Sequence, residues 1–251
     1  ALPGVDGGAG GIVQAAGLDP SGFANLNFAG LANVPPGAPF FPAAYHSGNE
    51  PAFALAMEAA DVAVQAFENA ETIEAGRNSL IAVLEENAQI LAKIADILKF
   101  KYLVKFGGID YSLAPFPEEA RSLGAAFERM GVPEVGLHGT LAAAAILTDA
   151  IDRARFPRAG FSGLMMPVLE DAVLAERAAE GRLTVKDLLL YSAVCGTGLD
   201  TVPLAGDVTS GQIAALLLDL SALAMRLEKP LTARLMPVPG KQAGDMTSFD
   251  F

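Results

Sequence analysis

Length, composition and charge exclude several classes of protein. The 251 residues are enough for one large α/β domain or two small ones. Hydrophobic residues make up 52% of the chain and charged residues 18%, which excludes a disordered or fibrous protein. A net charge of -12 repels phosphate backbones and anionic lipid surfaces, so we expect neither nucleic acid nor a membrane as a partner.

Hydropathy and cysteine content bear on location. The longest apolar stretch, GQIAALLLDLSALAMRL, is interrupted by Asp219 and Arg226 and is shorter than the ~20 residues of a membrane-spanning helix. The single cysteine, Cys195, excludes an internal disulfide, and we expect no signal peptide and a reducing, cytoplasmic location. Because the sequence starts at Ala1 and stops at SFDF, we expect residues 1–251 to form a single α/β domain that is incomplete at both ends.

The first hundred residues change character near Pro51. Residues 1–50 are rich in glycine and proline, with GGAGG and NVPPGAPFFP, which predicts loops around short strands such as NLNFAGL. From Pro51 to Phe67 the apolar residues have helical spacing, which predicts a helix. A second predicted helix runs from about Thr72 to Leu98, with acidic residues near its start and lysines near its end, as the helix dipole favours.

Strand-like and helix-like segments then alternate. KYLVKF precedes the loop GGIDYSLAPFPEE and a helix, and VGLHGT precedes LAAAAILTDAIDRA. AGFSGLMMPV precedes LEDAVLAERAAEG, SAVCGTGLDTVPLAGDV precedes SGQIAALLLDLSALAMRL, and TARLMPV is a last strand. This alternation predicts βαβ units and a mainly parallel sheet, either open or closed into a barrel.

Polar residues in the loops are candidates for function. The loops that leave the carboxyl ends of parallel strands gather on one side of the sheet, where ligands bind in such folds. These loops carry hydroxyls, carboxylates, one thiol, one imidazole and two cations: Asp110, Ser112, His138, Thr140, Cys195, Thr197, Asp200, Asp207, Arg234, Lys241 and Asp245.

Several candidates also have a structural interpretation. His138 in GLHGT is either a general base or a ring that hydrogen-bonds a backbone carbonyl beside a turn. Glu170 and Asp171 most simply supply negative charge to a helix N-terminus. The sequence contains no zinc, calcium or nucleotide-binding motif of the common spacings, and it leaves the cofactor unknown.

Six phrases together carry a family resemblance. ANVPPGAPFFPAAYHSG, FGGIDYSLAPFPEE, LHGTLAAAA, GFSGLMMPVLED, YSAVCGTGLDTVPLAGD and ARLMPVPGKQAGD occur in an order that resembles the domain of unknown function 711 family. That resemblance implies a fold similar to the pyruvate formate-lyase-like glycyl radical enzymes, an α/β barrel of about ten strands with outer helices and a loop inserted into the barrel. By this resemblance, the loop of Cys195, Gly196 and Gly198 corresponds to the loop that those enzymes insert into the barrel. No segment of the sequence resembles the radical glycine motif, so the resemblance does not imply radical chemistry.

Three hypotheses about function follow. In the first, an enzyme acts on a small polar metabolite at the barrel mouth, with Cys195 as nucleophile and His138 or Asp200 as its base. Its substrate-binding residues are Asp110, Ser112, Thr140, Thr197, Asp207, Arg234 and Lys241. In the second, a binding protein without turnover holds a cation or a polyhydroxylated ligand through Asp110, Asp200, Asp207 and Asp245.

In the third hypothesis the protein is structural or oligomeric, and Cys195 is a small buried hydrophobe. A face of small apolar residues can pack against a second copy as readily as against the chain's own sheet, and we expect a homodimer. This face carries Ala52, Leu55, Ala59, Ala63 and Ala66.

Overall fold

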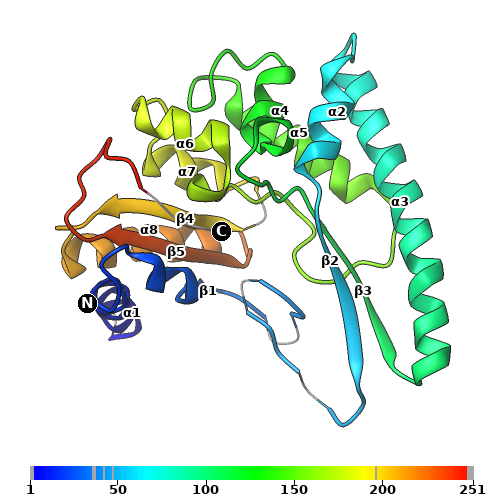
Figure 1. The fold of residues 1–251 in the computed structure, drawn as a ribbon, viewed down its shortest axis with the longest axis horizontal. Helices are drawn as coiled ribbons and strands as arrows, with labels where there is room; N and C mark the ends of the chain where they lie inside the picture. Colours follow the sequence, from blue (N-terminus) through cyan, green and yellow to red (C-terminus); the bar gives the residue numbers. More distant parts are fainter. Residues whose placement is uncertain (1–2, 36–37, 42, 47, 196, 248–251) are drawn as a thin grey trace.

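The structure, a computed structural model, describes residues 3–35, 38–41, 43–46, 48–195 and 197–247. The α/β class is confirmed, but the predicted barrel is wrong, because the strands of the described residues form two small open sheets (Figure 1). The five strands of the described residues are divided between a three-stranded and a two-stranded sheet, and neither sheet closes on itself.

The first sheet pairs two parallel strands beside four helices. Its strands pair from Ala52 with Lys105 to Glu58 with Ser112, with an irregular register between Phe53 and Leu55. The helices pack against each other and against this sheet (Figure 1). The elements are β2 (Ala52–Glu58), β3 (Lys105–Ser112), α2 (Ala60–Glu68), α3 (Ile73–Tyr102), α4 (Leu123–Arg129) and α5 (Thr140–Arg153).

The second sheet has the order β1-β5-β4, with β4 parallel and β1 antiparallel to the central strand. Two helices from opposite ends of the chain, α1 and α8, pack together against it, and α7 contacts β4 (Figure 1). Its elements are β1 (Gly30–Ala32), β4 (Gly198–Ala205) and β5 (Leu231–Val238), with α1 (Pro3–Ala16), α6 (Ala172–Ala179), α7 (Val185–Tyr191) and α8 (Ser210–Arg226). Short 3-10 turns occur at Phe23–Asn27, Glu119–Arg121 and Val168–Glu170.

Residues 157–167, which we call the bridging segment, connect the two sheets. The Ile109 amide of β3 donates to the Pro157 carbonyl at 2.7 Å, and the Leu113 amide donates to Gly163 at 2.9 Å. On its other side, Pro167 forms a parallel bridge with Asp200 of β4. Prolines and glycines prevent a regular strand here, because they remove ladder donors and admit turns. One hydrophobic core nevertheless runs through both sheets.

Four other predicted elements differ in the structure. The strand predicted at KYLVKF begins later, because Lys101 and Tyr102 still belong to helix α3, and β3 continues through GGIDYS, which was predicted as a loop. Residues 51–67, predicted as one helix, are helical only in their second half, as α2; the first half is strand β2, because parallel pairing with β3 satisfies its backbone groups. The glycine-rich start is helix α1, where Gly11 lets the Phe28 ring lie so close that a Cβ would be 2.7 Å from it. VGLHGT is a turn, with Gly136 and Gly139 at φ of +102° and +107°.

The elements with strong local signals agree with the predictions. Helix α3 extends the predicted 72–98 helix, and its Thr72 cap accepts a hydrogen bond from the Ala75 amide. Helix α8 begins in a capping box of Thr209 and Gln212, and β5 coincides with TARLMPV. Among the described residues, none of the helices is both long enough and apolar enough to cross a membrane.

Asp171 connects two helix N-termini in the core. Its buried carboxylate accepts hydrogen bonds from the Ser122 hydroxyl at 2.5 Å and from the amide of Leu123 at 2.7 Å, at the start of α4. It also accepts from the amides of Val173 and Leu174 at 3.0 Å, at the start of α6. The predicted capping role of Asp171 is therefore confirmed, and this one side chain orients two helices.

We expect Asp171→Ala to lower the free energy of unfolding by roughly 3–5 kcal/mol, because two helices lose their cap and several buried donors lose their acceptor. Asp187→Ala is the matched control. Asp187 accepts a hydrogen bond from the Thr184 amide in the solvent-exposed capping box of one helix only, α7, and its loss is expected to cost about 1 kcal/mol. Urea unfolding followed by circular dichroism measures both, and equal losses would contradict the shared-cap interpretation.

Candidate functional site

Cys195 lies in the short connection between α7 and β4. The predicted hairpin inside a barrel is wrong, because this connection sits at the amino end of a strand in an open sheet. Gly196, expected to permit the bend, lies outside the described residues. Gly198 has a φ of +96°, and a Cβ there would lie 2.6 Å from the Thr232 carbonyl oxygen. A glycine is therefore required at 198.

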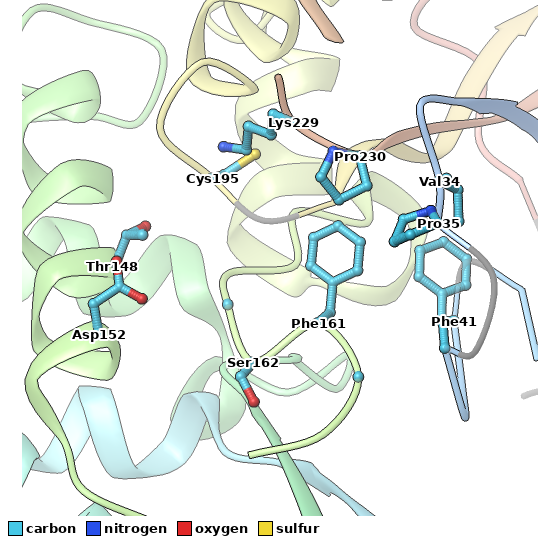
Figure 2. A pocket seen from close by; sticks show the side chains of 13 residues that line it. Val34, Pro35, Phe41, Thr148, Asp152, Phe161, Ser162, Cys195, Lys229 and Pro230 are labelled. Carbon is cyan, nitrogen blue, oxygen red and sulfur yellow. The ribbon is translucent and has the colours of Figure 1, made fainter. Parts of the chain in front are cut away.

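The thiol faces a cavity of about 290 Å³, which we call the Cys195 cavity. Figure 2 shows Cys195 and Lys229 on one side, Thr148 and Asp152 on another, and the rings of Phe161 and Phe41 along an apolar wall. The Cys195 residue itself is only 1% exposed. The lining residues are Val34, Pro35, Ala38, Phe41, Thr148, Asp152, Gly160, Phe161, Ser162, Gly163, Cys195, Lys229 and Pro230.

Lys229 has an unusual environment for a lysine. Its Nζ donates to the Ala193 carbonyl at 3.4 Å, and Figure 2 shows the amine beside the sulfur of Cys195. Burial lowers the pKa of Lys229 below the ordinary value of 10.5, although a thiolate at Cys195 and the carboxylate of Asp152 would act in the opposite direction. The cavity therefore holds a thiol next to an amine that is neutral more readily than a surface lysine.

Two further polar groups on α5 complete the polar side of this cavity. The hydroxyl of Thr148 lies 3.0 Å from the carbonyl oxygens of Ala144 and Val194, so it ties α5 to the backbone just before Cys195. Asp152 forms an ion pair with Arg158 at 3.6 Å. The carboxylate of Asp152 is therefore paired with a cation of the bridging segment and also acts electrostatically on the amine of Lys229.

Asp110 and Ser112, which we expected to bind substrate or metal, instead hold the bridging segment. The Asp110 carboxylate accepts from the amides of Phe161 and Ser162, both at 2.8 Å, and from the Ser112 hydroxyl at 2.6 Å. Gly160 has a φ of +59°, and a Cβ there would overlap the Asp110 carboxylate. These contacts place Phe161 and Ser162 in the cavity wall.

Two of the five non-glycine residues with positive φ among the described residues lie at or beside the same cavity. Ser162 in its wall has a φ of 46°, and Glu228, the residue before Lys229, has a φ of 52°. Non-glycine residues rarely adopt this left-handed conformation, and it is most frequent at functional sites, where the surrounding structure maintains it. The strain therefore agrees with a role for the cavity beyond packing.

Asp200, expected to be a catalytic base or metal ligand, lies in a buried ion-pair network outside the Cys195 cavity. Its Oδ1 accepts from Nε of Arg234 at 2.7 Å, and Arg234 also contacts Glu170 at 3.2 Å. The other oxygen, Oδ2, makes no hydrogen bond of ordinary geometry with the described residues, although the Thr201 backbone is near enough to affect it. Burial raises the pKa of Asp200, against the effect of Arg234.

Arg234 connects this network to the cavity wall. Its guanidinium carbon lies 5.0 Å from the ring centroid of Phe41, which lines the Cys195 cavity. Burial, followed by the charge of Asp200, raises the pKa of Glu170, and Arg234 partly offsets this increase. Arg234, expected to bind substrate, is thus occupied by two carboxylates of the protein.

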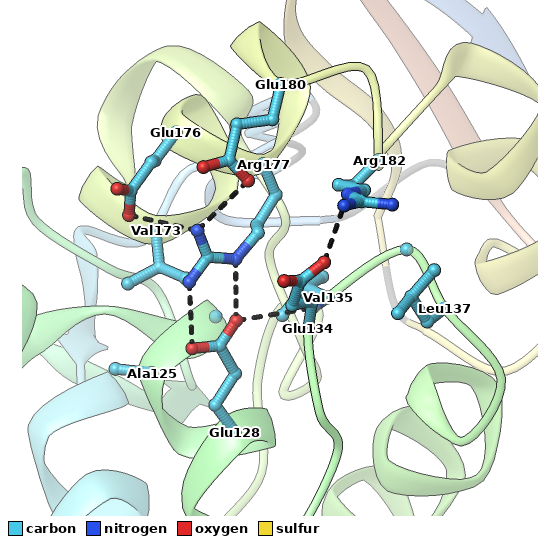
Figure 3. Close-up of polar contacts among 12 residues, drawn as sticks. Ala125, Glu128, Glu134, Val135, Leu137, Val173, Glu176, Arg177, Glu180 and Arg182 are labelled. Atoms are coloured by element: carbon cyan, nitrogen blue, oxygen red, sulfur yellow. Dashed lines mark hydrogen bonds and ion pairs between the residues drawn. The ribbon is translucent and has the colours of Figure 1, made fainter.

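His138 lies exposed in the loop between α4 and α5, and it is not among the residues of the Cys195 cavity. Figure 3 shows the contacts that fix this region, in which Arg177 pairs with Glu128 at 2.8 Å and Glu128 also accepts from the Val135 amide. Hydrogen bonding to Glu128 raises the pKa of Arg177. The loop is anchored, but its imidazole is not paired with the thiol.

The remaining predicted residues also lie outside the lining of the Cys195 cavity. The hydroxyls of Thr140 and Thr197 donate to the backbone carbonyls of Leu137 and Leu164. Asp207 is exposed in the turn after β4. Lys241 and Asp245 belong to a C-terminal segment that lines a separate, mainly apolar cavity of about 610 Å³ beside α6 and α7.

The four aspartates proposed as metal ligands do not form one site. Asp245 accepts a hydrogen bond from the Gln242 amide at 2.7 Å and closes its own turn. Within the part of the chain that the structure describes, no three His, Cys, Asp or Glu side chains are close enough to share a metal ion.

Sequence reasoning missed Lys229, Asp152 and Thr148. One signal for Lys229 was present, since Cys195 and Lys229 each precede a strand, and neighbouring parallel strands begin side by side. Gly198 pairs with Thr232, and the Thr232 amide donates to the Thr197 carbonyl at 2.8 Å. The prediction considered only carboxyl ends of strands, and this site lies at amino ends. No comparable signal marks Asp152 or Thr148 on α5.

Fold and site define an open α/β protein with a cavity that contains a thiol and an amine. Residues 4–250 match the family model described as Uncharacterised ACR (DUF711), so the chain belongs to this family and the resemblance of its motifs is confirmed. The similarity to pyruvate formate-lyase-like folds is not confirmed by these matches.

The relatives are known by family name alone. The chain is 36% identical over 230 residues to a UPF0210 protein of Pyrobaculum arsenaticum, covering 88% of this chain and 51% of the relative. It is 34% identical over 251 residues to a UPF0210 protein of Oleidesulfovibrio alaskensis, covering 95% of this chain and 55% of the relative. The chain therefore spans about half the length of the curated relatives it matches.

We expect Arg234→Met to destabilise the protein by roughly 3–5 kcal/mol near pH 8, because Asp200 would lose its buried partner. Without Arg234 the pKa of Asp200 rises further, so the folded state retains a proton that the unfolded chain releases. The free energy of unfolding of Arg234→Met then falls as pH rises, so its loss of stability relative to wild type is larger at pH 8 than at pH 5.

Urea unfolding at both pH values measures this difference. The double variant Arg234→Met/Asp200→Asn removes the titrating group and is expected to abolish the extra pH dependence. Arg153→Met, which removes an exposed ion pair with Asp149, is the control, with an expected cost of less than about 1 kcal/mol. A loss in Arg234→Met that is the same at both pH values would contradict the assignment to Asp200.

Proposed function

We propose that the Cys195 cavity binds a small metabolite with an electrophilic carbonyl carbon, which Cys195 attacks with Lys229 as its base. The observation that carries this proposal is the shared cavity of a thiol and an amine whose pKa is lowered by burial. A lysine in a desolvated site is a typical activating group for a nucleophile. Lys229 therefore replaces His138 and Asp200 as the expected base.

The proposed chemistry is proton transfer followed by addition. The S–H proton of Cys195 moves to the neutral Nζ of Lys229, and the thiolate forms a bond to the carbonyl carbon of the substrate. The carbonyl π electrons move to its oxygen, which the new ammonium can stabilise or protonate. For an acyl substrate, collapse of this adduct expels the leaving group, which takes the proton.

The walls support a substrate with an apolar part. Phe41, Phe161 and the prolines Pro35 and Pro230 form a dry surface opposite the polar groups of α5 (Figure 2). The volume of about 290 Å³ is at the lower end of the range typical of ligand sites. A small acyl or carbonyl compound agrees with this size.

The same proposal includes a cytoplasmic location. It also includes the absence of nucleic acid and membrane partners, which the net charge of -12 supports.

A second candidate is a non-catalytic protein in which the thiol only packs. The 1% exposure of Cys195 favours it, since buried cysteines commonly act as small hydrophobes. The two candidates differ in the reactivity that they predict for the thiol.

Alkylation of Cys195 by iodoacetamide distinguishes these candidates. For the proposed function we expect labelling faster than that of a free cysteine peptide at pH 7.5, and a rate about tenfold lower in Lys229→Met because the base is lost. Lys241→Met, which removes a lysine outside the cavity, is the matched control and is expected to label like wild type. Slow labelling that Lys229→Met leaves unchanged would favour the packing thiol.

A further inference from the structure

Strand β4 has an irregular step at Asp200 and Thr201, which we call the β4 step. The register of β4 with β5 shifts between Leu199 and Val202. Thr201 has a φ of 37°, a left-handed conformation that β-branched residues rarely adopt. Asp200 and Thr201 are both 0% exposed, so the β4 step holds a carboxylate and a hydroxyl inside the protein.

The two side chains of the β4 step both act on Glu170. Neighbouring residues of a regular strand point to opposite faces, but a shift in register can turn their side chains toward the same side. Burial and the charge of Asp200 raise the pKa of Glu170, and a contact with the Thr201 hydroxyl lowers it. The carboxylates of Asp200 and Glu170 and the hydroxyl of Thr201 therefore form one polar cluster.

Two oxygen atoms of the β4 step have no hydrogen bond of ordinary geometry with any of the described residues. They are Oδ2 of Asp200 and Oγ1 of Thr201, and both atoms are buried. Buried polar atoms in folded proteins nearly always have a partner, and an exception calls for an explanation such as a bound ion. The β4 step therefore presents two oxygen atoms that can coordinate a ligand.

Charges around these oxygen atoms do not balance. Nε of Arg234 lies 2.7 Å from Oδ1 of Asp200, and Nη2 of Arg234 lies 3.2 Å from Oε1 of Glu170. Glu58, which also acts on Glu170, has a cation of its own in Arg121, at 4.0 Å. One guanidinium thus serves two carboxylates, and one negative charge remains. Because an unbalanced charge is costly to bury, the cluster favours one further positive charge.

We propose that Oδ2 of Asp200, Oγ1 of Thr201 and the carboxylate of Glu170 bind an alkali metal ion, Na⁺ or K⁺. Carboxylate and hydroxyl oxygens suit hard cations of this kind, and a single positive charge balances the cluster. A divalent ion would instead leave an excess of positive charge beside Arg234. The Glu170 side chain is 27% exposed, so the ion can reach the site from solvent.

The alkali metal site uses two carboxylates and a hydroxyl. It is therefore compatible with the finding that no three His, Cys, Asp or Glu side chains of the described residues can share a metal ion. Of the four aspartates predicted as metal ligands, only Asp200 belongs to this site.

The inference depends neither on the chemistry proposed for Cys195 nor on a second copy of the chain. The face that we expected to form a homodimer is packed within the chain. Ala59 and Ala63 on this face are 2% and 0% exposed, because α2 packs against α3 and α4. A second copy therefore cannot use these two alanines.

Urea unfolding at pH 8 in three chloride salts tests the proposal. The salts are NaCl, KCl and choline chloride, each at about 150 mM so that ionic strength is constant. Choline is too large to enter the site. We expect the unfolding equilibrium constant of the wild type to be about tenfold lower in NaCl or KCl than in choline chloride, because the ion binds only the folded state. The salt with the larger effect identifies the ion.

Variants assign the effect to the β4 step. In Glu170→Gln and Thr201→Val we expect the tenfold difference between salts to fall below about twofold, because the site loses a charge or a ligand. Glu170→Gln changes a partly exposed side chain, so it gives a result even if Thr201→Val does not fold. Thr197→Val is the matched control. Thr197 is an equally buried threonine whose hydroxyl donates to the Leu164 carbonyl, and its variant is expected to keep the tenfold difference.

An unfolding constant of the wild type that is the same in all three salts overturns the proposal. That result would leave a proton shared by Asp200 and Glu170 as the balancing charge, since binding of a proton does not depend on the alkali metal ion present. A difference between salts that Glu170→Gln retains in full also overturns the proposal, because the ion would then act elsewhere on the protein.

Discussion

The carboxylate of Asp110 is the constraint on which the site depends. It accepts two amides and one hydroxyl from Phe161, Ser162 and Ser112, at 2.6–2.8 Å, and so holds the bridging segment against β3. The bridging segment has too many prolines and glycines to pair as a regular strand, and it needs this side chain as an acceptor. Without it, the bridging segment would keep its backbone hydrogen bonds to β3 but lose the acceptor that fixes Phe161 and Ser162 in the wall of the Cys195 cavity.

The parallel pairing of β4 with β5 then brings the reactive groups together. Because the two strands start side by side, the residues just before them, Cys195 and Lys229, meet at the amino edge of the sheet. On the same strands the buried pair of Asp200 and Arg234 joins β4 to β5 and supports Phe41 in the opposite wall. The ion pair of Asp200 and Arg234 thus stabilises the sheet, and the thiol of Cys195 and the amine of Lys229 do not take part in it.

The sequence predicted the features that depend on local signals. Helices α3 and α8 carry their own caps at Thr72 and Thr209, and β5 is a short apolar run between clear breaks. The family was also identified from its motifs. Strand β2 was misassigned because an alanine-rich run has helical and extended alternatives, and only its pairing with β3, about 50 residues away, decides between them.

The site was harder to predict because its contacts are long-range. Asp110 and Asp200 were expected to bind a substrate or a metal ion or to act as a base, but their partners within the protein lie 51 and 34 residues away. A single sequence does not show whether a carboxylate already accepts hydrogen bonds from other residues of the same protein. The barrel was inferred from the family resemblance, but the five strands of the described residues form two open sheets.

The most direct test of the account is an NMR titration of Lys229 through its ε-carbon, in wild type and in Cys195→Ala. The account predicts that Lys229 loses its proton below the ordinary pH of 10.5. It also predicts a further decrease in the pKa in Cys195→Ala, because the negative charge that opposes burial is removed. A lysine that titrates near 10.5 and does not respond to Cys195→Ala would contradict the pairing of thiol and amine in one buried site.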